Sequence, residues 1–376
     1  MQHHNASIAS IASILGLLLA ACGDNASVTA PPDAALPVAP SRAVIVAGDY
    51  KDSSASVLTT LDLATDEVKP KVGPAMAVGV DPMLRHFGNE LFVVNRLPDH
   101  NIAILDDHTL ALKEQINLGD TSNPQDVAVI GNKLYVASLG TKGVTVVTRG
   151  SAATTEIDLS ADDPDGVPDC NSIYAVDNKL YVSCGLLDGF SPVRAGRVYV
   201  VDPATNTVVS DRTVSLLHKN PFGLFERIPD GAPHAGDLVI STVEDFAAAG
   251  CVERFTPGAA PSAATCMVAG ADLAGYPTRV AFDGAASVMF LAVARTFPDG
   301  DLRAFDLPTE SLWAGALNPA AQAIGDVAVC PDSSIVVADK AAAANGLRVY
   351  VGSAEQTTAA LPIGIATFST HGLVCY

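Results

Sequence analysis

Basic residues are scarce in this sequence. The chain has 22 Lys and Arg against 41 Asp and Glu, which gives a formal net charge of −19. The acidic residues are spread along the chain rather than gathered in a tail. This balance argues against binding to nucleic acid or to an anionic lipid surface, whereas cationic partners and metal ions remain compatible with it.

Familiar catalytic motifs are missing as well. The sequence has no Gly-x-Ser-x-Gly elbow, no glycine-rich phosphate loop and no dinucleotide fingerprint in a strand-to-helix context. Its histidines lack the His-x-x-x-His or Glu-x-x-His spacing of a metal or acid–base site. Motifs therefore give no support to a nucleophilic enzyme, although a fold that gathers distant residues could still assemble a site.

Charged residues are few, at 17%, whereas apolar residues make up 49% of the chain. This composition excludes a disordered protein. The 30 glycines and 24 prolines suit many short buried strands separated by turns.

The N-terminus carries a short apolar run over residues 8–21, which fits the core of a signal peptide better than a membrane span. The run ends in Leu19-Ala20-Ala21-Cys22-Gly23, which resembles the lipobox of bacterial lipoproteins. The resemblance implies a signal peptide over residues 1–21, a lipid on Cys22 and, because Gly23 follows, an outer-membrane location. Residues 1–5 lack the expected Lys or Arg. The alternative is therefore a buried apolar segment with an incidental cysteine.

Residues 25–41 are rich in Pro, Ala and Ser, as in a semi-extended tether. We therefore expect three parts: a signal peptide (1–21), the lipidated cysteine with its tether (22–41) and one folded domain (42–376).

The folded domain repeats itself every 40 to 58 residues, a period typical of propellers. The clearest copies are residues 88–95, 131–138 and 177–184, each a tight turn followed by an apolar strand. A short strand precedes each copy and two further strands follow it. Four antiparallel strands per unit is the composition of a propeller blade.

The motifs within the units run in a constant order. Pro-x-x-Val-Ala-Val at residues 124–129, Lys-Leu-Tyr-Val at 133–136 and 179–182, and Val-Tyr-Val-Val-Asp-Pro-Ala-Thr-Asn at 198–206 are the best examples. They resemble the YVTN family of bacterial and archaeal surface β-propellers over most of residues 42–376. The resemblance implies an architecture and specifies no activity.

Counting the units predicts seven four-stranded blades, with six or eight as alternatives. Six complete copies begin near Asp81, Asn123, Asp169, Asn220, Tyr276 and Ile324. Residues 43–73 supply the second to fourth strands of another blade, and residues 363–376 supply a first strand alone. Joined together, the two ends of the domain would complete the seventh blade and leave no exposed sheet edge.

Six cysteines lie beyond Cys22, and an exported protein meets an oxidising compartment. None stands in a zinc-like spacing, so disulfides are favoured over metal ligation. Cys170 and Cys184 flank the turn at 177–178 at near-matching distances, which predicts a cross-hairpin disulfide. Cys251 and Cys266 lie on the expected third and fourth strands of one blade. By elimination Cys330 would pair with Cys375 and hold the C-terminal strand.

The longest insertions fall between strands two and three or between blades. They are residues 48–55, 96–101, 160–169, 185–196, 216–220, 243–250, 295–300 and 340–346. In a propeller these connections share one face, which we call the long-loop face. Binding residues concentrate in long loops on a rigid scaffold, so this face is the candidate site unless the insertions are neutral.

One of these insertions contains an acidic motif. Residues 161–170 read Ala-Asp-Asp-Pro-Asp-Gly-Val-Pro-Asp-Cys and resemble one thrombospondin type 3 calcium repeat. The resemblance implies Ca²⁺ on Asp163, Asp165 and Asp169, with Gly166 at the sharp turn. Ala161 stands where a first acidic residue is expected. The alternative is an acidic surface loop pinned by Cys170.

These observations favour a cell-envelope lipoprotein that acts as a non-enzymatic binding scaffold for a protein, glycan or small ligand at the long-loop face. No cofactor other than Ca²⁺ is indicated, and the membrane is contacted through the lipid alone. One alternative is a propeller enzyme, such as a calcium-assisted lactonase or a quinone-linked dehydrogenase, which would need carboxylates and a histidine at the central channel. Another is a structural spacer, whose axis would be apolar. Four charged residues could line the channel, although we expect them to be solvated surface charges: Glu226, Arg279, Arg303 and Asp326.

Overall fold

The structure is a computed structural model that describes residues 41–50, 55–151, 153–258, 260–285, 287–296 and 299–376. Cys22, the predicted signal peptide and the tether up to residue 40 lie outside the described residues. Within these ranges no helix is long and apolar enough to cross a membrane.

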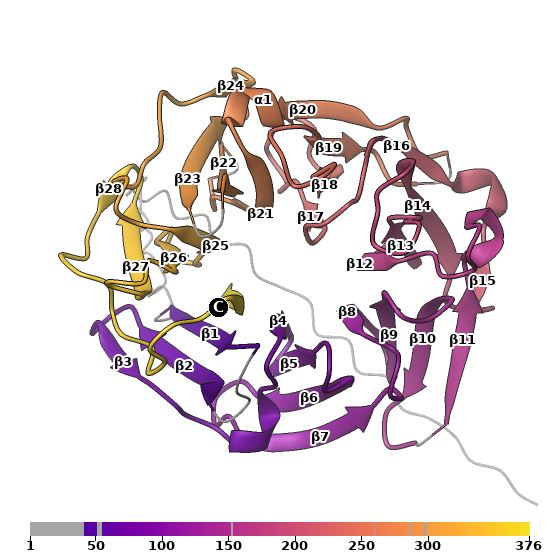
Figure 1. Ribbon diagram of the computed structural model, residues 1–376, viewed down its shortest axis with the longest axis horizontal. Coiled ribbons are helices and arrows are strands. Elements are labelled where there is room, and N and C mark those ends of the chain that lie inside the picture. The colour runs from indigo at the N-terminus through magenta and orange to yellow at the C-terminus, as the bar shows by residue number, and fades with distance from the viewer. Residues whose placement is uncertain (1–40, 51–54, 152, 259, 286, 297–298) are drawn as a thin grey trace, which may run out of the picture. The chain divides into compact units, whose positions relative to one another are not determined.

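Seven antiparallel sheets stand in a ring around a central axis, and each sheet is one blade (Figure 1). The first strand of each blade lies nearest the axis. This all-β propeller with seven blades confirms the predicted fold. The described helices are single turns: η2 (Ala75–Ala77), η3 (Ser160–Asp162), η4 (Ser210–Arg212) and α1 (Gly270–Leu273).

Blades 1 to 4 contain the N-terminal half of the ring. Blade 1 consists of β29 (Thr370–Cys375), β1 (Arg42–Gly48), β2 (Val57–Asp62) and β3 (Glu67–Lys69). Blade 2 consists of β4 (Pro82–Phe87), β5 (Glu90–Asn95), β6 (Asn101–Asp106) and β7 (Leu112–Asn117). Blade 3 consists of β8 (Pro124–Ile130), β9 (Lys133–Ser138), β10 (Gly143–Thr148) and β11 (Thr154–Asp158). Blade 4 consists of β12 (Cys170–Val176), β13 (Lys179–Cys184), β14 (Ala195–Asp202) and two short strands along β14, namely β15 (Thr207–Val208) and β16 (Val214–Lys219).

Blades 5 to 7 complete the ring. Blade 5 consists of β17 (Glu226–Arg227), β18 (Leu238–Thr242), β19 (Cys251–Phe255) and β20 (Thr265–Ala269). Blade 6 consists of β21 (Tyr276–Phe282), β22 (Val288–Ala294), β23 (Gly300–Asp306) and β24 (Ser311–Leu312). Blade 7 consists of β25 (Ile324–Val329), β26 (Ile335–Asp339), β27 (Gly346–Val351) and β28 (Ala354–Glu355).

The ring closes as the sequence predicted. Strand β29, from the end of the chain, pairs antiparallel with β1, from Ala43 opposite Cys375 to Gly48 opposite Thr370. Blade 1 therefore contains strands from both ends of the domain. Because both edges of β1 are paired, neither remains open to another chain.

The hydrophobic core is divided among the seven contacts between neighbouring blades, each of which holds one cluster of buried apolar residues. Successive side chains of a strand point to opposite faces of its sheet, so one strand serves two clusters. In β13, for example, Leu180 and Val182 pack toward blade 3, whereas Tyr181 packs toward blade 5. This explains why the central strands read as continuous apolar runs.

The aspartates that end the third strands close the following turns. Asp106 accepts the backbone N–H of Thr109 at 2.9 Å, and its pKa is lowered chiefly by that bond. Asp62, Asp202 and Asp306 accept backbone N–H groups in the same way. The recurring Asp turn therefore has a local hydrogen-bonding cause.

The structure contains three disulfides, and they are the three expected pairs. Cys170–Cys184 crosses the β12–β13 hairpin, and Cys251–Cys266 joins β19 to β20. Cys330–Cys375 links the end of β25, the first strand of blade 7, to the ring-closing strand β29. Three disulfides fit an oxidising compartment outside the cytoplasm.

Candidate functional site

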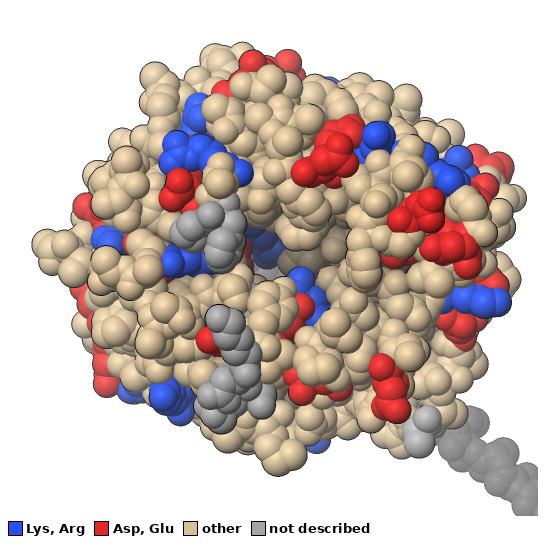
Figure 2. Space-filling model, in the orientation of Figure 1, with Lys and Arg blue, Asp and Glu red and all other residues tan. Residues whose placement is uncertain are grey.

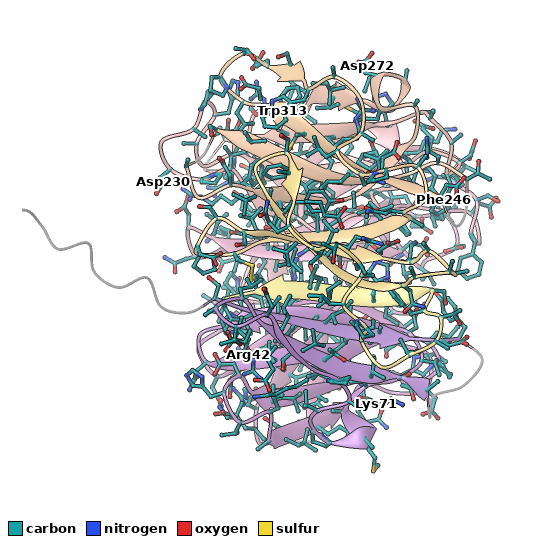
Figure 3. The ribbon with its side chains drawn as sticks, turned by 90° about the vertical axis from the view of Figure 1, so that its left-hand side faces the viewer. Arg42, Lys71, Asp230, Phe246, Asp272 and Trp313 are labelled. Atoms are coloured by element: carbon teal, nitrogen blue, oxygen red, sulfur yellow. A yellow bond between two sulfur atoms is a disulfide. The ribbon has the colours of Figure 1, made fainter. Side chains whose placement is uncertain are left out.

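The long loops lie on one face of the ring, as expected. In the side view, Phe246 of the 243–250 loop and Lys71 lie at one side, whereas Arg42 and Asp230 lie at the other (Figure 3). The side of Phe246 is the long-loop face. Figure 2 looks onto this face and shows a hollow at its centre with Lys and Arg atoms inside it.

A cavity of about 670 Å³ opens in this hollow at the end of the ring axis; we call it the axial pocket. All seven blades contribute residues to it, from Val80 of blade 2 around to His371 of blade 1. Five of the long loops also reach it, through Tyr50, Arg96, Phe246, Asp299 and Lys340 respectively. The loop over residues 185–196 does not line it. The candidate face therefore has a defined concave site.

The first strands of several blades are bulged where they meet the pocket. The pairing register shifts by one residue at four positions: Gln125, Asn171, Thr278 and Gly325. One of these bulge residues is a glycine and the other three have polar side chains. All four residues line the axial pocket. A bulge re-aims a side chain out of the pleat, which explains how polar groups from buried strands face the cavity.

Beneath the pocket, charged side chains from different blades meet at the axis. Arg85 of blade 2 donates two hydrogen bonds to Asp126 of blade 3, at 2.8 and 2.7 Å. The second carboxylate oxygen of Asp126 also accepts the Ser172 hydroxyl at 2.7 Å and the Ile173 N–H at 3.0 Å. Burial disfavours the charge of Arg85, but the Asp126 carboxylate outweighs this and raises the pKa of Arg85.

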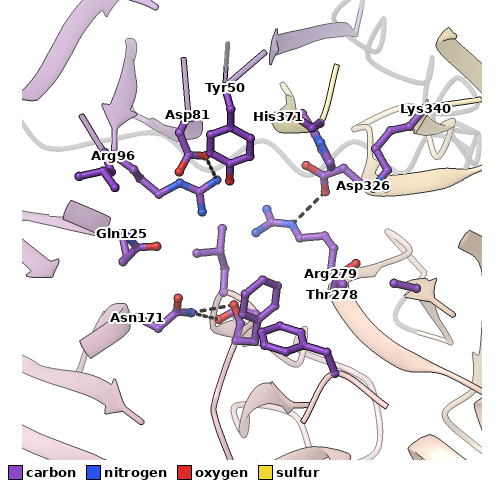
Figure 4. A pocket seen from close by; sticks show the side chains of 18 of the residues that line it. Tyr50, Asp81, Arg96, Gln125, Asn171, Thr278, Arg279, Asp326, Lys340 and His371 are labelled. Carbon is purple, nitrogen blue, oxygen red and sulfur yellow. Dashed lines mark hydrogen bonds and ion pairs between the residues drawn. The ribbon is translucent and has the colours of Figure 1, made fainter. Parts of the chain in front are cut away.

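The network continues across the axis. Glu226 of blade 5 lies 3.7 Å from Arg85 and 3.3 Å from Arg279 of blade 6. Arg279 in turn lies 3.6 Å from Asp326 of blade 7. We call Arg85, Asp126, Glu226, Arg279 and Asp326 the axial ion network. Of this network, Arg279 and Asp326 line the axial pocket (Figure 4).

The expectation that the four channel charges are solvated surface charges was wrong, because each of them is at least partly buried. Asp326 is 7% exposed, and desolvation raises its pKa to about 6 against the opposing charge of Arg279. Glu226 and Arg279 are partly buried and ion-paired at the axis. Arg303, the fourth residue, lies on β23 and donates to the Leu273 carbonyl instead. The other three groups are removed from bulk water because the first strands of different blades meet at the axis. A local sequence pattern does not show which strands will meet.

Lys340 and His371 come together with Asp326 at one wall. Gly325 makes this possible, because a Cβ there would lie 2.6 Å from Cε of Lys340 and 2.8 Å from Cε1 of His371. Desolvation lowers the pKa of Lys340, partly countered by Asp326. Desolvation and the nearby Lys340 charge lower the pKa of His371 to about 3, so its ring is neutral at physiological pH. Motif spacing missed this group because its members come from two blades.

The neighbouring wall carries an ion pair and a phenol. Asp81 and Arg96 are 2.6 Å apart, and Arg96 points toward the middle of the pocket (Figure 4). Desolvation raises the pKa of Asp81, although Arg96 opposes this. Desolvation and the Asp81 charge also raise the pKa of Tyr50. Asp81 therefore interacts with both Arg96 and Tyr50.

The remaining walls are aromatic and amide. The rings of Phe222 and Phe246 stand edge to face at 5.2 Å, and Phe246 meets Tyr276 at 5.7 Å. Phe222 and Phe246 line the pocket and remain 39% and 46% exposed, so part of the surface of each residue is accessible. Asn171 lies beside them and donates to the backbone carbonyls of Phe222 and Gly223.

The expected calcium residues lie in the loop before β12, away from the axial pocket. Asp163 accepts the N–H groups of Asp165 and Gly166, and its other carboxylate oxygen is buried without a hydrogen-bond donor. Asp169 accepts the Leu187 N–H at 3.0 Å. In the described part of the chain, no group of three or more His, Cys, Asp or Glu side chains is arranged to hold a metal ion. The calcium site stays a prediction.

Calcium binding to this loop can be tested by thermal unfolding. With the affinity typical of extracellular sites, 10 mM CaCl₂ is expected to stabilise the full chain by about 1–3 kcal/mol, because Ca²⁺ binds the folded state. An Asp163→Ala/Asp165→Ala variant should show no gain, and MgCl₂ at equal concentration controls for ionic strength. Equal responses of the variant and the original chain would refute the site.

Because of Asp169, we expect the free energy of unfolding to depend on pH. Desolvation, reinforced by the charges of Asp165 and Asp163, raises its pKa to about 7, above the value of about 3.9 in an unfolded chain. The folded state therefore binds the proton more tightly, and this contribution to stability is lost as pH rises through 7. Asp169→Asn is expected to be more stable than the original chain at pH 8 by about 2 kcal/mol, with the difference closing toward pH 4.

Urea unfolding at pH 5, 6.5 and 8 measures this effect. The matched control is Asp188→Asn, which changes an exposed aspartate of the neighbouring loop and should leave the pH dependence unchanged. A constant difference between Asp169→Asn and the original chain at all three pH values would contradict the prediction. Bound Ca²⁺ would also flatten the curve, since it favours the ionised carboxylate.

Comparison with known proteins gives the architecture only. No protein-family model matches the chain, and no curated relative matches it. Among solved structures, the chain is similar to apo AztD from Citrobacter koseri (13% identity, TM-score 0.53, 89% of this chain and 98% of that one). It is also similar to Kuenenia stuttgartiensis hydrazine synthase (18%, 0.54, 78% and 89%) and to the β-propeller domain of Cps50 (Swd1) from Myceliophteria thermophila (10%, 0.55, 78% and 92%). At these identities the likeness establishes a β-propeller, and the site must be interpreted from its own residues.

Proposed function

We propose that this chain is a lipid-anchored protein of the cell envelope that binds a small polar organic ligand in the axial pocket, without turnover. The observation that carries the proposal is the pocket itself: its volume of about 670 Å³ lies in the range of small-molecule sites, and all seven blades build it. Its mixture of aromatic walls and a few fixed polar groups is typical of such sites. Anchoring through Cys22 follows from the lipobox resemblance, and the three disulfides are consistent with export.

The polar axis favours a binding role over the two alternatives. A structural spacer would need an apolar axis, whereas the axial ion network places five charged side chains there. An enzyme would need a carboxylate and a histidine at the axis, and Asp326 and His371 do meet there. However, Asp326 is engaged by Arg279 and by the Leu373 N–H, and a histidine with a pKa of about 3 is a poor proton donor or acceptor near neutral pH.

Blocking the pocket tests the proposal. Thr278 stands at a bulge in the wall, so Thr278→Trp should occupy the part of the cavity next to this wall, whereas Thr278→Val preserves the size of the cavity. We expect saturation-transfer NMR with a library of amino acids, sugars, organic acids and amines to detect ligands of the full chain. Their affinity should fall at least about tenfold in Thr278→Trp, or 1.4 kcal/mol, and stay within about threefold in Thr278→Val. Ligand affinity that is unchanged in Thr278→Trp, or the absence of any bound ligand, would contradict the proposal.

A further inference from the structure

The charges that line the axial pocket cancel. Three cationic residues and three carboxylates line it, against a net charge of −19 for the whole chain; they are Arg96, Arg279, Lys340, Asp81, Asp299 and Asp326. Arg96 is paired with Asp81 at 2.6 Å, and Arg279 with Asp326 at 3.6 Å. A ligand with a net charge would lose its hydration and would have to compete with these internal partners. The pocket therefore suits an uncharged ligand.

Two amide side chains present fixed acceptors to the cavity. Gln125 and Asn171 are only 6% and 9% exposed. The NH₂ group of Gln125 donates to the backbone oxygen of Asn123 at 3.1 Å, and that of Asn171 donates to the Phe222 carbonyl at 2.7 Å. With the nitrogens used, each carbonyl oxygen is turned toward the pocket (Figure 4). A ligand on this side must supply O–H or N–H donors.

The neighbouring wall, formed by blade 2, presents hydrogen-bond donors (Figure 4). The Arg96 guanidinium points toward the middle of the pocket and uses one terminal nitrogen on Asp81 (Figure 4). Guanidinium groups donate and never accept. A ligand without net charge must therefore donate hydrogen bonds to Gln125 and Asn171 and accept them from Arg96 (Figure 4). Hydroxyl groups do both, and several hydroxyls on one ring do so in different directions.

The aromatic wall supplies the third requirement. Phe222, Phe246 and Tyr276 form a continuous edge-to-face group beside Asn171, and the two phenylalanines keep open surface. Such a surface buries the C–H face of a saturated ring while the ring's hydroxyls reach the amides. Resting on the proposed function, we infer that the axial pocket binds a neutral saccharide, with one pyranose ring against Phe222 and Phe246 and its hydroxyls between Asn171, Gln125 and Arg96.

The inference is tested with defined sugars on the full chain. The probes are glucose, galactose, mannose, N-acetylglucosamine and their common disaccharides, with glucosamine and glucuronate as charged analogues. Titration calorimetry should give a measurable Kd for at least one neutral sugar, and about tenfold weaker binding for its charged counterparts. Phe246→Ala and Gln125→Met should each weaken binding by about tenfold. Phe190→Ala is the matched control, because Phe190 is an 86% exposed phenylalanine on a long loop that does not line the pocket.

The outcomes separate this inference from the function on which it rests. Tighter binding of a zwitterionic amino acid or a charged analogue, sensitive to Thr278→Trp, would overturn the saccharide and leave a ligand-binding pocket. Sugar binding that is equally weakened by Phe190→Ala and Phe246→Ala would also overturn it. The absence of any Thr278→Trp-sensitive ligand would overturn both. Melting temperatures of all variants establish that each one is folded.

Discussion

Asp126→Ala is expected to lower the free energy of unfolding by about 3–5 kcal/mol, because it leaves a buried charge without its partner. The Asp126 side chain is fully buried, and its carboxylate binds Arg85 through two hydrogen bonds. The carboxylate also accepts hydrogen bonds from the Ser172 hydroxyl and the Ile173 N–H of the next blade. The substitution therefore leaves hydrogen-bond donors from two blades without an acceptor. Urea unfolding followed by circular dichroism measures the loss.

Two further variants identify its cause. In Asp126→Asn an amide oxygen can still accept, so we expect a smaller loss than in Asp126→Ala. In an Arg85→Met/Asp126→Leu double variant neither charge remains, and it should recover much of the loss because apolar replacements of a buried pair are often nearly neutral. A loss below about 1 kcal/mol for Asp126→Ala would mean that the pair behaves as a solvated surface ion pair.

Removing the Cys330–Cys375 disulfide is the second large effect. In the chain-entropy model a bond with a sequence separation of 45 restricts the unfolded chain by about 4 kcal/mol, which Cys330→Ser/Cys375→Ser should lose. The bond also holds β29, the single strand from the C-terminus that closes the ring. We therefore expect the variant to open first at blade 1, seen as faster amide hydrogen exchange in β1 and β29.

Cys251→Ser/Cys266→Ser provides the comparison. Its disulfide has a sequence separation of 15 and lies within one blade, so the expected loss is about 3 kcal/mol and the ring-closing strands should keep their protection. Thermal unfolding under oxidising conditions ranks the two variants. If the Cys330 variant lost no more stability than the Cys251 variant, and exchange in β29 were unchanged, ring closure would not depend on this bond.

The sequence alone was sufficient where the cause is local. The repeated turn and apolar strand of residues 131–138 and 177–184 predicted the blades, because strand alternation and turn chemistry act between near neighbours. The incomplete units at the two ends predicted that β29 would join β1. Cys170 and Cys184 could be paired because their hairpin turn lies midway between them.

The candidate site was predicted only as a face. The long loops indicated which side of the ring to examine and contribute polar lining residues such as Arg96 and Lys340, yet the axial ion network comes from the first strands of different blades. In the first strands Asp126, Ser172, Arg279 and Asp326 each stand directly before a buried branched residue, and this repeated position was the available signal. This repeated position does not show which charged residues of different blades pair with one another.

The sequence by itself therefore predicted the blades from a repeat of about fifty residues, and it predicted their number and the closure of the ring from the incomplete units at the two ends of the domain. Tertiary structure decided the chemistry of the axis. Only the packing of the blades against one another sets Arg85 against Asp126, places Lys340 beside His371 and removes Asp326 from water. Burial and charge pairing depend on distances between residues far apart in the chain, and those distances do not exist until the seven blades are assembled.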